Sequence, residues 1–351
     1  MRVEARAPAR VDLAGGTVDI WPLYLFHPGA QTVNLAIRCY ASCVIETRSD
    51  QRLVVVSQDR EVQESFEDFA DLARGKSQLP LVRELLVFFE PHRGLNIETR
   101  SQVPAGAGLG GSSALNIALC GGLARVTGKH VTRTQILEIA KNVEAITIRV
   151  PTGWQDYFPA LYGGANVVHL SPEGVKREKI PVFVSELEKR FVLCYTGQPR
   201  DSAINNWEVM KSHIDGDAQV RRNFDKITTI ASQMREALLT GDWKDVAELL
   251  ALEWENRKQN FKGISTPTID NMIEQTRKQG TVAAKVCGAG GGGCVVFMVE
   301  PGTKPAVEEA LTQMGGQIID FAFSRTGLEV WADQQERAQE VPEEEPEKDL
   351  P

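Results

Sequence analysis

The sequence lacks the segments that would place a protein across a membrane or direct it out of the cell. No stretch approaches the roughly 18 unbroken apolar residues that a membrane-spanning helix needs. The N-terminus, MRVEARAPARVD, has no apolar core of the kind that a secretion signal carries. We therefore expect a cytoplasmic protein that does not associate with a membrane.

Cysteine and histidine patterns typical of disulfide frameworks or metal sites are also absent. The six cysteines include no CxxC pair, and four of them lie within apolar runs, so reduced thiols in the core are favoured over disulfides or metal ligands. The five histidines are scattered without metal-ligand spacing, and none belongs to a motif. A Ser-His-Asp or Cys-His mechanism therefore has no support in the sequence.

Excess charge is confined to one end of the chain. The formal net charge is −8, and the segment 333–351, DQQERAQEVPEEEPEKDLP, contributes −6 through eight acids and two bases. The remaining body is near −2, which gives no basis for a nucleic-acid or membrane surface. Because the segment is poor in apolar residues and holds three prolines, we expect an acidic disordered tail.

The first half of the chain contains both strand and helix patterns. Alternating apolar residues predict strands, and an almost wholly apolar run from 112 to 126 predicts a buried helix that Gly128 ends. The following helix begins with Thr132 as N-cap, and Gln135 completes a capping box. The strands expected in this half are 31–48, 52–57, 94–99 and 163–170.

A new pattern starts after about residue 185, so a domain boundary is expected near 172–188. It opens with the apolar strand RFVLCYTG and continues with long helical stretches. The helices expected there are 203–239, 243–260, 267–279 and 304–314, and the strands are 283–287, 293–299 and 316–331. With 351 residues, 42% of them hydrophobic, the chain is long enough for two α+β domains, each with its own core.

A glycine-rich loop, VPAGAGLGGSSAL at 103–115, precedes the buried helix. It does not fit a dinucleotide-binding turn, because the preceding GLNIETRSQVP alternates and ends in proline and GLARVTGKH at 122–130 has no acid. A Walker A loop would need a lysine before the serine, which GGSS lacks. The converging backbone N–H groups at a helix N-terminus nevertheless favour phosphate binding, with a tight packing corner as the alternative.

A second glycine cluster, KVCGAGGGGCVVFMV at 285–299, leads into an apolar strand rather than a helix. Four consecutive glycines before a buried strand indicate a close backbone approach to another segment, for which the loop at 103–115 is a candidate. A glycine-rich hairpin is the alternative.

A third segment, RAPARVDLAGGTVDIWPLY at 6–24, makes the two glycine clusters more informative when all three are considered together. Together the three segments resemble the motifs of the GHMP kinases, which are named for galactokinase, homoserine kinase, mevalonate kinase and phosphomevalonate kinase. The motifs occur in order and at sensible separations from residue 7 to residue 299. The resemblance therefore covers the whole body of the chain except the tail.

The resemblance implies an α+β fold of two domains. The N-terminal ATP-binding domain, expected over 1–175, would be similar to domain 2 of ribosomal protein S5. The C-terminal domain, expected over 186–332, would be ferredoxin-like, and the acidic tail would occupy 333–351. The active site would lie between the two domains, where both glycine clusters meet.

The resemblance also implies ATP and Mg²⁺ as cofactors. Ser113 would be a Mg²⁺ ligand together with Glu144, although a solvated glutamate at a helix end is the alternative for the latter. The residues expected to contact the phosphates of ATP are Pro104, Gly106, Gly108, Leu109, Gly110, Gly111, Ser112 and Ser113.

Two residues are expected to act in catalysis. Asp156, in PTGWQDYFPALYGG at 151–164, would accept the proton of the attacking sugar hydroxyl or orient that hydroxyl; a turn-capping role is the alternative. Arg10 would stabilise the charge that develops during transfer, unless it is an ordinary strand arginine.

A further group of residues is expected at the substrate. Asp19 would form hydrogen bonds with sugar hydroxyls, and Trp21 would form an apolar wall of the pocket or belong to the core. Arg200 would hold a substrate 7-phosphate or form a surface ion pair. The residues assigned to substrate binding are Asp19, Gly16, Trp21, Gly290 and Gly291.

The substrate end of the first motif distinguishes the subfamilies. It lacks the GEH of mevalonate kinases and galactokinases, and it resembles the RIxFAGGGTD pattern of bacterial heptose 7-phosphate kinases and L-fucokinases. Thr17 and Val18 depart from that pattern, and Tyr157 stands where glutamine is usual. These departures put the identity of the sugar in doubt rather than the kinase chemistry.

We accordingly expect a sugar kinase that phosphorylates a small-molecule acceptor at a hydroxyl, with the anomeric oxygen of a heptose 7-phosphate or a related sugar as the favoured site. A kinase of the mevalonate, homoserine or galactose type is one alternative. A sensor that binds sugar and ATP without catalysis is another, but such a protein is expected to lose part of the phosphoryl-transfer machinery, which is complete here.

Overall fold

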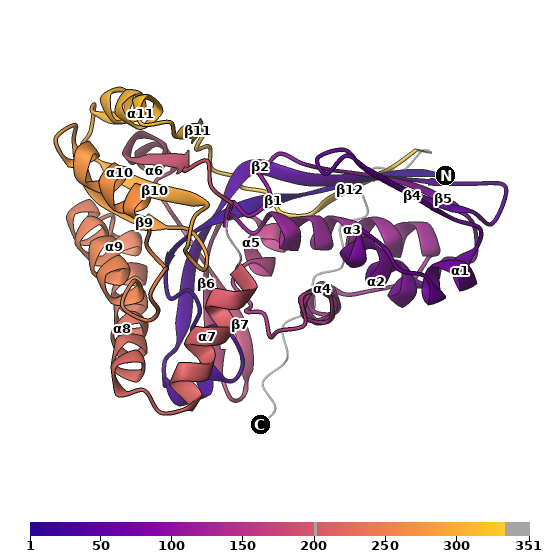
Figure 1. The fold of residues 1–351 in the computed structure, drawn as a ribbon, viewed down its shortest axis with the longest axis horizontal. Helices are drawn as coiled ribbons and strands as arrows, with labels where there is room; N and C mark the ends of the chain where they lie inside the picture. Colours follow the sequence, from indigo (N-terminus) through magenta and orange to yellow (C-terminus); the bar gives the residue numbers. More distant parts are fainter. Residues whose placement is uncertain (200–201, 334–351) are drawn as a thin grey trace.

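The computed structural model describes residues 1–199 and 202–333, which form two β-sheets with helices packed around them (Figure 1). Arg200, for which a substrate-phosphate contact and a surface ion pair were the alternatives, lies outside the described residues. So do tail residues 334–351, for which the sequence predicts disorder. All six cysteines are buried, as expected for thiols of the core. No helix in the described part of the chain combines the length and the apolar character that crossing a bilayer requires.

The larger sheet is built on two long antiparallel strands near the N-terminus. Along β2, the end near residue 33 pairs with β6 and the end near residue 45 pairs with β5, so one strand joins two parts of the sheet. The path through the sheet is β12 (Glu329–Ala332), β1 (Arg2–Ala14), β2 (Gln31–Thr47), β5 (Leu95–Ser101), β3 (Leu53–Ser57) and β4 (Val62–Phe66), with β6 (Ala165–Ser171) beside β2 and β7 (Gly174–Ile180) beside β6.

The burial pattern of β1 shows where the two domains meet. Inward and outward residues alternate up to Ala7, and every residue from Pro8 to Ala14 is buried. Side chains from the second half of β1, such as Val11, share a core cluster with Met234 of a helix in the second domain. This half of the strand is covered on both faces, and it is the half that carries the predicted catalytic arginine.

Helices cover one face of the larger sheet (Figure 1). The central helix α3 is buried along most of its length and ends at Gly128 in the left-handed conformation, as the sequence predicts. The capping box formed by Thr132 and Gln135 is also confirmed. The helices of this part are α1 (Phe69–Arg74), α2 (Pro80–Phe89), α3 (Gly111–Thr127), α4 (Arg133–Ile148), α5 (Tyr157–Tyr162) and the short 3₁₀ helix η1 (Leu23–Phe26).

The smaller sheet is antiparallel and has the order β11 (Gln317–Ile319), β8 (Phe191–Tyr195), β10 (Cys294–Val299) and β9 (Thr281–Val286). A helical region follows β8 and a helix joins β10 to β11, which is the ferredoxin-like arrangement that was expected. The helices are α6 (Val184–Arg190), α7 (Ser202–Ile214), α8 (Ala218–Thr240), α9 (Trp243–Arg257), α10 (Pro267–Arg277) and α11 (Lys304–Gln313).

Several elements differ from the sequence expectation. The helical stretch expected at 203–239 is two helices, because Gly216 has a positive φ and Asp217 caps the N-terminus of α8. The sequence pattern did not predict β1, β4, β7, α1, α2, α5 or α6, most of which are short. The stretch expected as strand at 316–331 is divided between the two sheets.

The end of the described chain returns to the larger sheet. Strand β12 pairs with β1, so the stretch 186–332, expected as the second domain, contributes one strand to the first. Just before it, Leu328 donates its N–H to the carbonyl of Leu161 at 3.1 Å. A Cβ on Gly327 would lie 2.2 Å from that same carbonyl oxygen, so the returning segment is packed tightly against α5.

Candidate functional site

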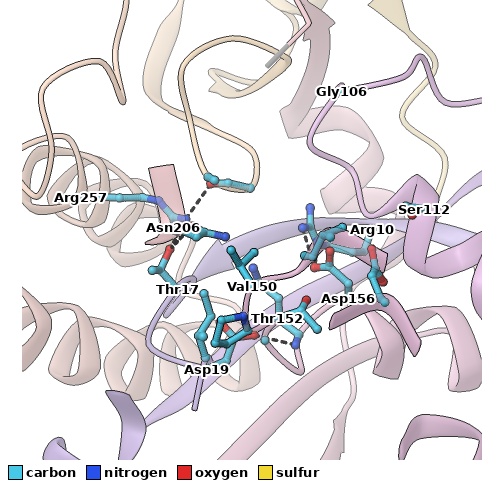
Figure 2. Close-up of a pocket in the computed structure, with 18 of the residues that line it drawn as sticks. Arg10, Thr17, Asp19, Gly106, Ser112, Val150, Thr152, Asp156, Asn206 and Arg257 are labelled. Carbon is cyan, nitrogen blue, oxygen red and sulfur yellow. Dashed lines mark hydrogen bonds and ion pairs between the residues drawn. The ribbon is translucent and has the colours of Figure 1, made fainter. Parts of the chain in front are cut away.

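Two cavities adjoin each other where the two domains meet. The larger one, of about 630 Å³, is lined mostly by polar side chains from both domains and is called the polar cavity below (Figure 2). The second, of about 390 Å³, runs along the glycine-rich loop and is called the loop cavity. The two cavities share the lining residues Gly106, Ser112, Glu144 and Asp156.

The loop at 103–115 forms one wall of the loop cavity. Gly106, Gly108 and Gly110 have positive φ, and helix α3 begins directly after them at Gly111. The opposite wall includes apolar residues from the start of α2, among them Leu79 and Val82. Backbone N–H groups at a helix N-terminus beside an apolar wall suit a ligand with a phosphate and a flat apolar part.

The two glycine clusters touch, as the sequence predicts. The N–H of Cys294 donates to the carbonyl of Ala107 at 2.7 Å. A Cβ on Gly293 would lie 2.6 Å from the same carbonyl oxygen, so only glycine permits this approach. The glycines at 290–293 therefore bring the second domain against the phosphate-binding loop.

Most residues of the predicted phosphate loop line the loop cavity. Leu109 is the exception: its side chain is buried, and its carbonyl accepts the N–H of Arg10 at 2.9 Å. The residues of the predicted set that line the cavity are Pro104, Gly106, Gly108, Gly110, Gly111, Ser112 and Ser113.

Arg10, which is buried, and Asp156, which is partly exposed, form an ion pair at the junction of the cavities. The Nη2 and Nε atoms of Arg10 lie 2.6 Å and 2.8 Å from Oδ1 of Asp156. Its Nη1 donates to the carbonyl of Gly108, so the same guanidinium also holds the loop. Burial would lower the pKa of Arg10, but Asp156 and Asp12 together raise it above its ordinary value, and the group stays charged.

A buried charge network lies behind this pair, and the sequence analysis did not identify it. The carboxylate of Asp12 receives Nζ of Lys285 at 2.7 Å and the N–H of Gly288 at 2.9 Å. Arg257 and Lys285 both contact Glu253, at 3.3 Å and 3.4 Å. Burial opposes the ionisation of Asp12, but the surrounding cations lower its pKa below its ordinary range. The network ties β1 to α9 and β9.

Asp19 lies in the polar cavity, as predicted, and is buried. Its Oδ2 accepts the N–H of Gln155 at 2.9 Å, and a Cβ on Gly153 would lie 2.0 Å from that oxygen. Its Oδ1 is buried without a hydrogen-bond partner among the described residues. Burial, with a contribution from Asp156, raises the pKa of Asp19 to about 6. Oδ1, which is buried without a partner among the described residues, can accept a hydrogen bond from a ligand hydroxyl.

Ser113 and Glu144 are brought together on α3 and α4. Ser113 Oγ donates to Glu144 Oε2 at 2.8 Å, and the hydroxyl of Tyr157 donates to the same oxygen at 2.6 Å. Glu144 is buried, so the alternative of a solvated helix-end glutamate is wrong. Burial raises the pKa of Glu144 even though both hydroxyl donors lower it. A buried carboxylate beside a hydroxyl supplies the oxygen ligands that Mg²⁺ prefers.

Three of the predicted substrate residues lie away from the polar cavity. Trp21 is 60% exposed and lines a separate hollow, because Val18 and Ile20 turn into the core and leave the indole outside. Gly290 and Gly291 pack against Ile264 instead.

Other residues occupy the places that those three were expected to fill. Gly288 and Ala289 line the polar cavity in place of Gly290 and Gly291. Gly16 packs directly beneath the guanidinium of Arg257.

Asn206 and Arg257 also line the polar cavity, although they were not predicted from the sequence. The spacing of Glu253 and Arg257, four residues apart on α9, was a signal for an ion pair. It gave no indication that the pair lies beside a motif some 240 residues earlier in the chain.

Comparisons with known proteins agree with this arrangement. A family model described as "GHMP kinases N terminal domain" matches residues 79–164, and one described as "GHMP kinases C terminal" matches residues 234–317. The D-glycero-alpha-D-manno-heptose 7-phosphate kinase of Campylobacter jejuni is 26% identical over 342 residues, covering 94% of this chain and 98% of that one. A mevalonate kinase of Thermococcus sibiricus is 25% identical over 360 residues, covering 94% and 98%.

A solved structure supports the fold. The D-glycero-D-manno-heptose 1-phosphate kinase from Bacteroides thetaiotaomicron superposes with a TM-score of 0.76, at 24% identity, over 95% of this chain and 100% of that one. The two-domain α+β fold expected from the sequence is confirmed.

Proposed function

The chain belongs to the GHMP kinase family, and on that premise we propose that it is a sugar kinase that transfers the γ-phosphoryl group of ATP to a hydroxyl of a sugar or sugar phosphate. The observation that carries the proposal is the shared wall between the two cavities. A donor in the loop cavity and an acceptor in the polar cavity would meet at Asp156, Ser112 and Gly106. Phosphoryl transfer depends mainly on such positioning and on charge stabilisation.

The loop cavity is assigned to ATP. Its apolar wall at 79–82 would hold the base, and the backbone N–H groups at the start of α3 would hold the phosphates. The contact between Cys294 and Ala107 fixes the loop against the second domain, and phosphates bound to the loop would then lie beside the polar cavity.

In the proposed reaction, Asp156 takes the proton of the acceptor hydroxyl while that oxygen forms a bond to the γ-phosphorus. The bond from the γ-phosphorus to the bridging oxygen breaks, and ADP leaves. Arg10 holds the carboxylate of Asp156 in one orientation and would offset the charge on the transferring group.

Ser113 and Glu144 are assigned to a Mg²⁺ ion that accompanies ATP. Their oxygens fit the metal, which commonly takes one or two carboxylates together with phosphate oxygens. Bound there, Mg²⁺ would neutralise charge on the β- and γ-phosphates. The hydroxyl of Tyr157 would then keep Glu144 in the orientation seen here.

The polar cavity is assigned to the acceptor. Asp19, Thr17, Asn206 and Arg257 line it with hydrogen-bonding groups, which suits a molecule with many hydroxyls. The similarity to a heptose 7-phosphate kinase over nearly the whole chain favours the anomeric oxygen of a heptose 7-phosphate or a related sugar as the site of phosphorylation.

The test is ADP release by the purified protein with Mg-ATP and a panel of acceptors. The panel contains a heptose 7-phosphate, L-fucose, galactose, mannose, arabinose, mevalonate and homoserine, and Asp156→Asn serves as the inactive control. Turnover of one sugar that is lost in the variant supports the proposal. Turnover of mevalonate or homoserine alone overturns the acceptor class. If no acceptor in the panel causes ADP release although the protein binds ATP, a non-catalytic sensor is favoured.

A further inference from the structure

Thr17 has a backbone conformation that its side chain disfavours. Its φ is +73°, in the left-handed region, where glycine is the least strained residue and a β-branched residue is a marked outlier. The residue begins the turn in which Ile20 donates its N–H to the Thr17 carbonyl at 3.2 Å, and this turn carries Asp19 into the polar cavity. Glycine at this position would form the same turn with less strain.

The Thr17 side chain makes two contacts that glycine would lose. Its Oγ1 accepts a hydrogen bond from Nη2 of Arg257 at 2.9 Å and lies 3.5 Å from Oδ1 of Asn206, toward which it donates. These three residues form one side of the polar cavity, and Arg10, Asp156 and Ser112 lie at the other (Figure 2). Strained conformations held by such contacts are concentrated at functional sites.

Arg257 depends on the same turn for its position. A Cβ on Gly16 would lie 2.3 Å from Nη1 of Arg257, so the glycine leaves the space that the guanidinium fills. Nη2 also donates to the carbonyl of Gly288 at 2.6 Å, and Nη1 contacts Glu253 at 3.3 Å. The guanidinium thus spans from the first domain to the second: in the first it contacts Thr17 and, at 3.7 Å, the carboxylate of Asp12.

We propose that Thr17 is a specificity-determining positioning residue, whose hydroxyl holds Arg257 and Asn206 as one polar wall of the acceptor cavity. This inference rests on the proposed function. The wall lies across the cavity from Asp156, so it contacts the oxygen-bearing end of the acceptor that is remote from the reacting hydroxyl. When this wall is fixed, it holds the acceptor in one position relative to Asp156. The wall also distinguishes acceptors that differ at the end remote from the reacting hydroxyl.

The test compares Thr17→Ser, which keeps the hydroxyl, with Thr17→Ala, which removes it, and with Thr17→Gly, which also relieves the backbone. Steady-state kinetics are measured on the acceptor panel, and thermal unfolding is followed for each variant. Thr312→Ala on α11, an exposed threonine remote from both cavities, is the matched control.

The expected result is a rise of about tenfold in the acceptor KM for the Ala and Gly variants, the usual size for loss of one hydrogen bond to a charged group. The KM for ATP stays unchanged, and the differences in kcat/KM among the sugars become smaller. Thr17→Ser keeps the wild-type preference. The Gly variant is at least as stable as the wild type, which separates the effect on acceptors from damage to the fold.

Wild-type acceptor KM and preference in Thr17→Ala would overturn the inference, as would a Ser variant as impaired as the Ala variant. An equal rise in the KM for ATP would also count against it. If the wild type turned over no acceptor, the proposed function would fail on that result, and calorimetric sugar affinity of the same variants would decide the role of Thr17. An absence of sugar binding to the wild type would overturn both.

Discussion

Both side-chain contacts from Arg10 to Asp156 reach a single oxygen, Oδ1, at 2.6 Å from Nη2 and 2.8 Å from Nε. The other oxygen of the carboxylate, Oδ2, is not used by Arg10 and is the atom that can take a proton from an acceptor. Because Nη1 of the same guanidinium also donates to the carbonyl of Gly108, the proposed base and the phosphate loop are held by one side chain. This coupling explains how the two cavities keep a common wall.

Asp156→Asn is expected to abolish turnover while leaving nucleotide binding intact. The amide keeps the shape of the side chain but cannot accept the proton, and general-base catalysis typically contributes about 10²- to 10⁴-fold in rate. ADP release measures the first effect, and an ATP titration by calorimetry measures the second. A variant with more than a tenth of the wild-type kcat would show that Asp156 is not the base.

The acceptor kcat/KM is expected to rise with pH through about 6. Burial raises the pKa of Asp19 to about 6, and the ionised carboxylate is the stronger acceptor for a sugar hydroxyl. Asp19→Asn should flatten this part of the pH profile and raise the acceptor KM. An unchanged inflection in the variant would assign it to another group.

The same pKa shift makes a prediction about stability. The folded protein binds the Asp19 proton more tightly than the unfolded chain, whose carboxyl titrates near 3.8, so stability from this group is lost as pH rises from about 4 through 6. The free energy of unfolding of Asp19→Asn, relative to that of the wild type, should therefore be higher at pH 7 than at pH 4. Urea unfolding at the two pH values measures this difference.

Glu144→Gln is expected to raise the Mg²⁺ concentration needed for half-maximal activity by about tenfold or more, because a neutral amide is a weaker Mg²⁺ ligand than a carboxylate. The assay is ADP release as a function of Mg²⁺ at fixed ATP. Glu138→Gln is the matched control, since it makes the same change at an exposed glutamate of the same helix that lines neither cavity. Equal Mg²⁺ dependence of Glu144→Gln and the wild type would contradict the assignment.

Lys285→Met is expected to destabilise the protein by about 3–5 kcal/mol, because it removes from the buried network the cation that lies 2.7 Å from Asp12 and 3.4 Å from Glu253. Lys244→Met removes a lysine from an exposed pair with Glu248 and should cost less than about 0.5 kcal/mol. Urea unfolding of both variants gives the comparison. Similar values for the two would mean that the buried network contributes little.

His213 is expected to make the protein less stable as pH falls. It is buried with its Nε2 2.8 Å from Nε2 of His27, and burial together with His27 lowers its pKa to about 4. The unfolded chain, with an ordinary histidine pKa near 6.5, binds the proton more readily, so stability is lost between about 6.5 and 4. His213→Gln should reduce this loss in unfolding experiments, and an undiminished loss would exclude His213 as its source.

Local features of the fold were predictable from the sequence, because they depend on neighbouring residues. The capping box at Thr132 and the end of α3 at Gly128 are of this kind. The meeting of the two glycine clusters was one of two interpretations of the sequence, because a run of four glycines fits a close backbone approach or a glycine-rich hairpin; the structure shows the close approach.

Long-range relationships were not predictable from local pattern. Asp12 and Lys285 are a single buried pair in space, but nothing in the alternation of either strand indicates a charged partner on the other. Trp21 was placed by residue type alone, which does not distinguish the two sides of a turn. The conformation of Thr17 is invisible in the sequence, since threonine is a poor indicator of positive φ.

The return of the chain to its first sheet has a consequence for the order of synthesis. On a ribosome, β1 is made first, yet its edge partner β12 and the segment packed on α5 are made last. The packing of α5, the helix that follows Asp156, is therefore complete only after residues 327–332 have been synthesised. A chain released early would carry every predicted catalytic residue and still lack the segment that packs on the C-terminal end of α5 at Leu161.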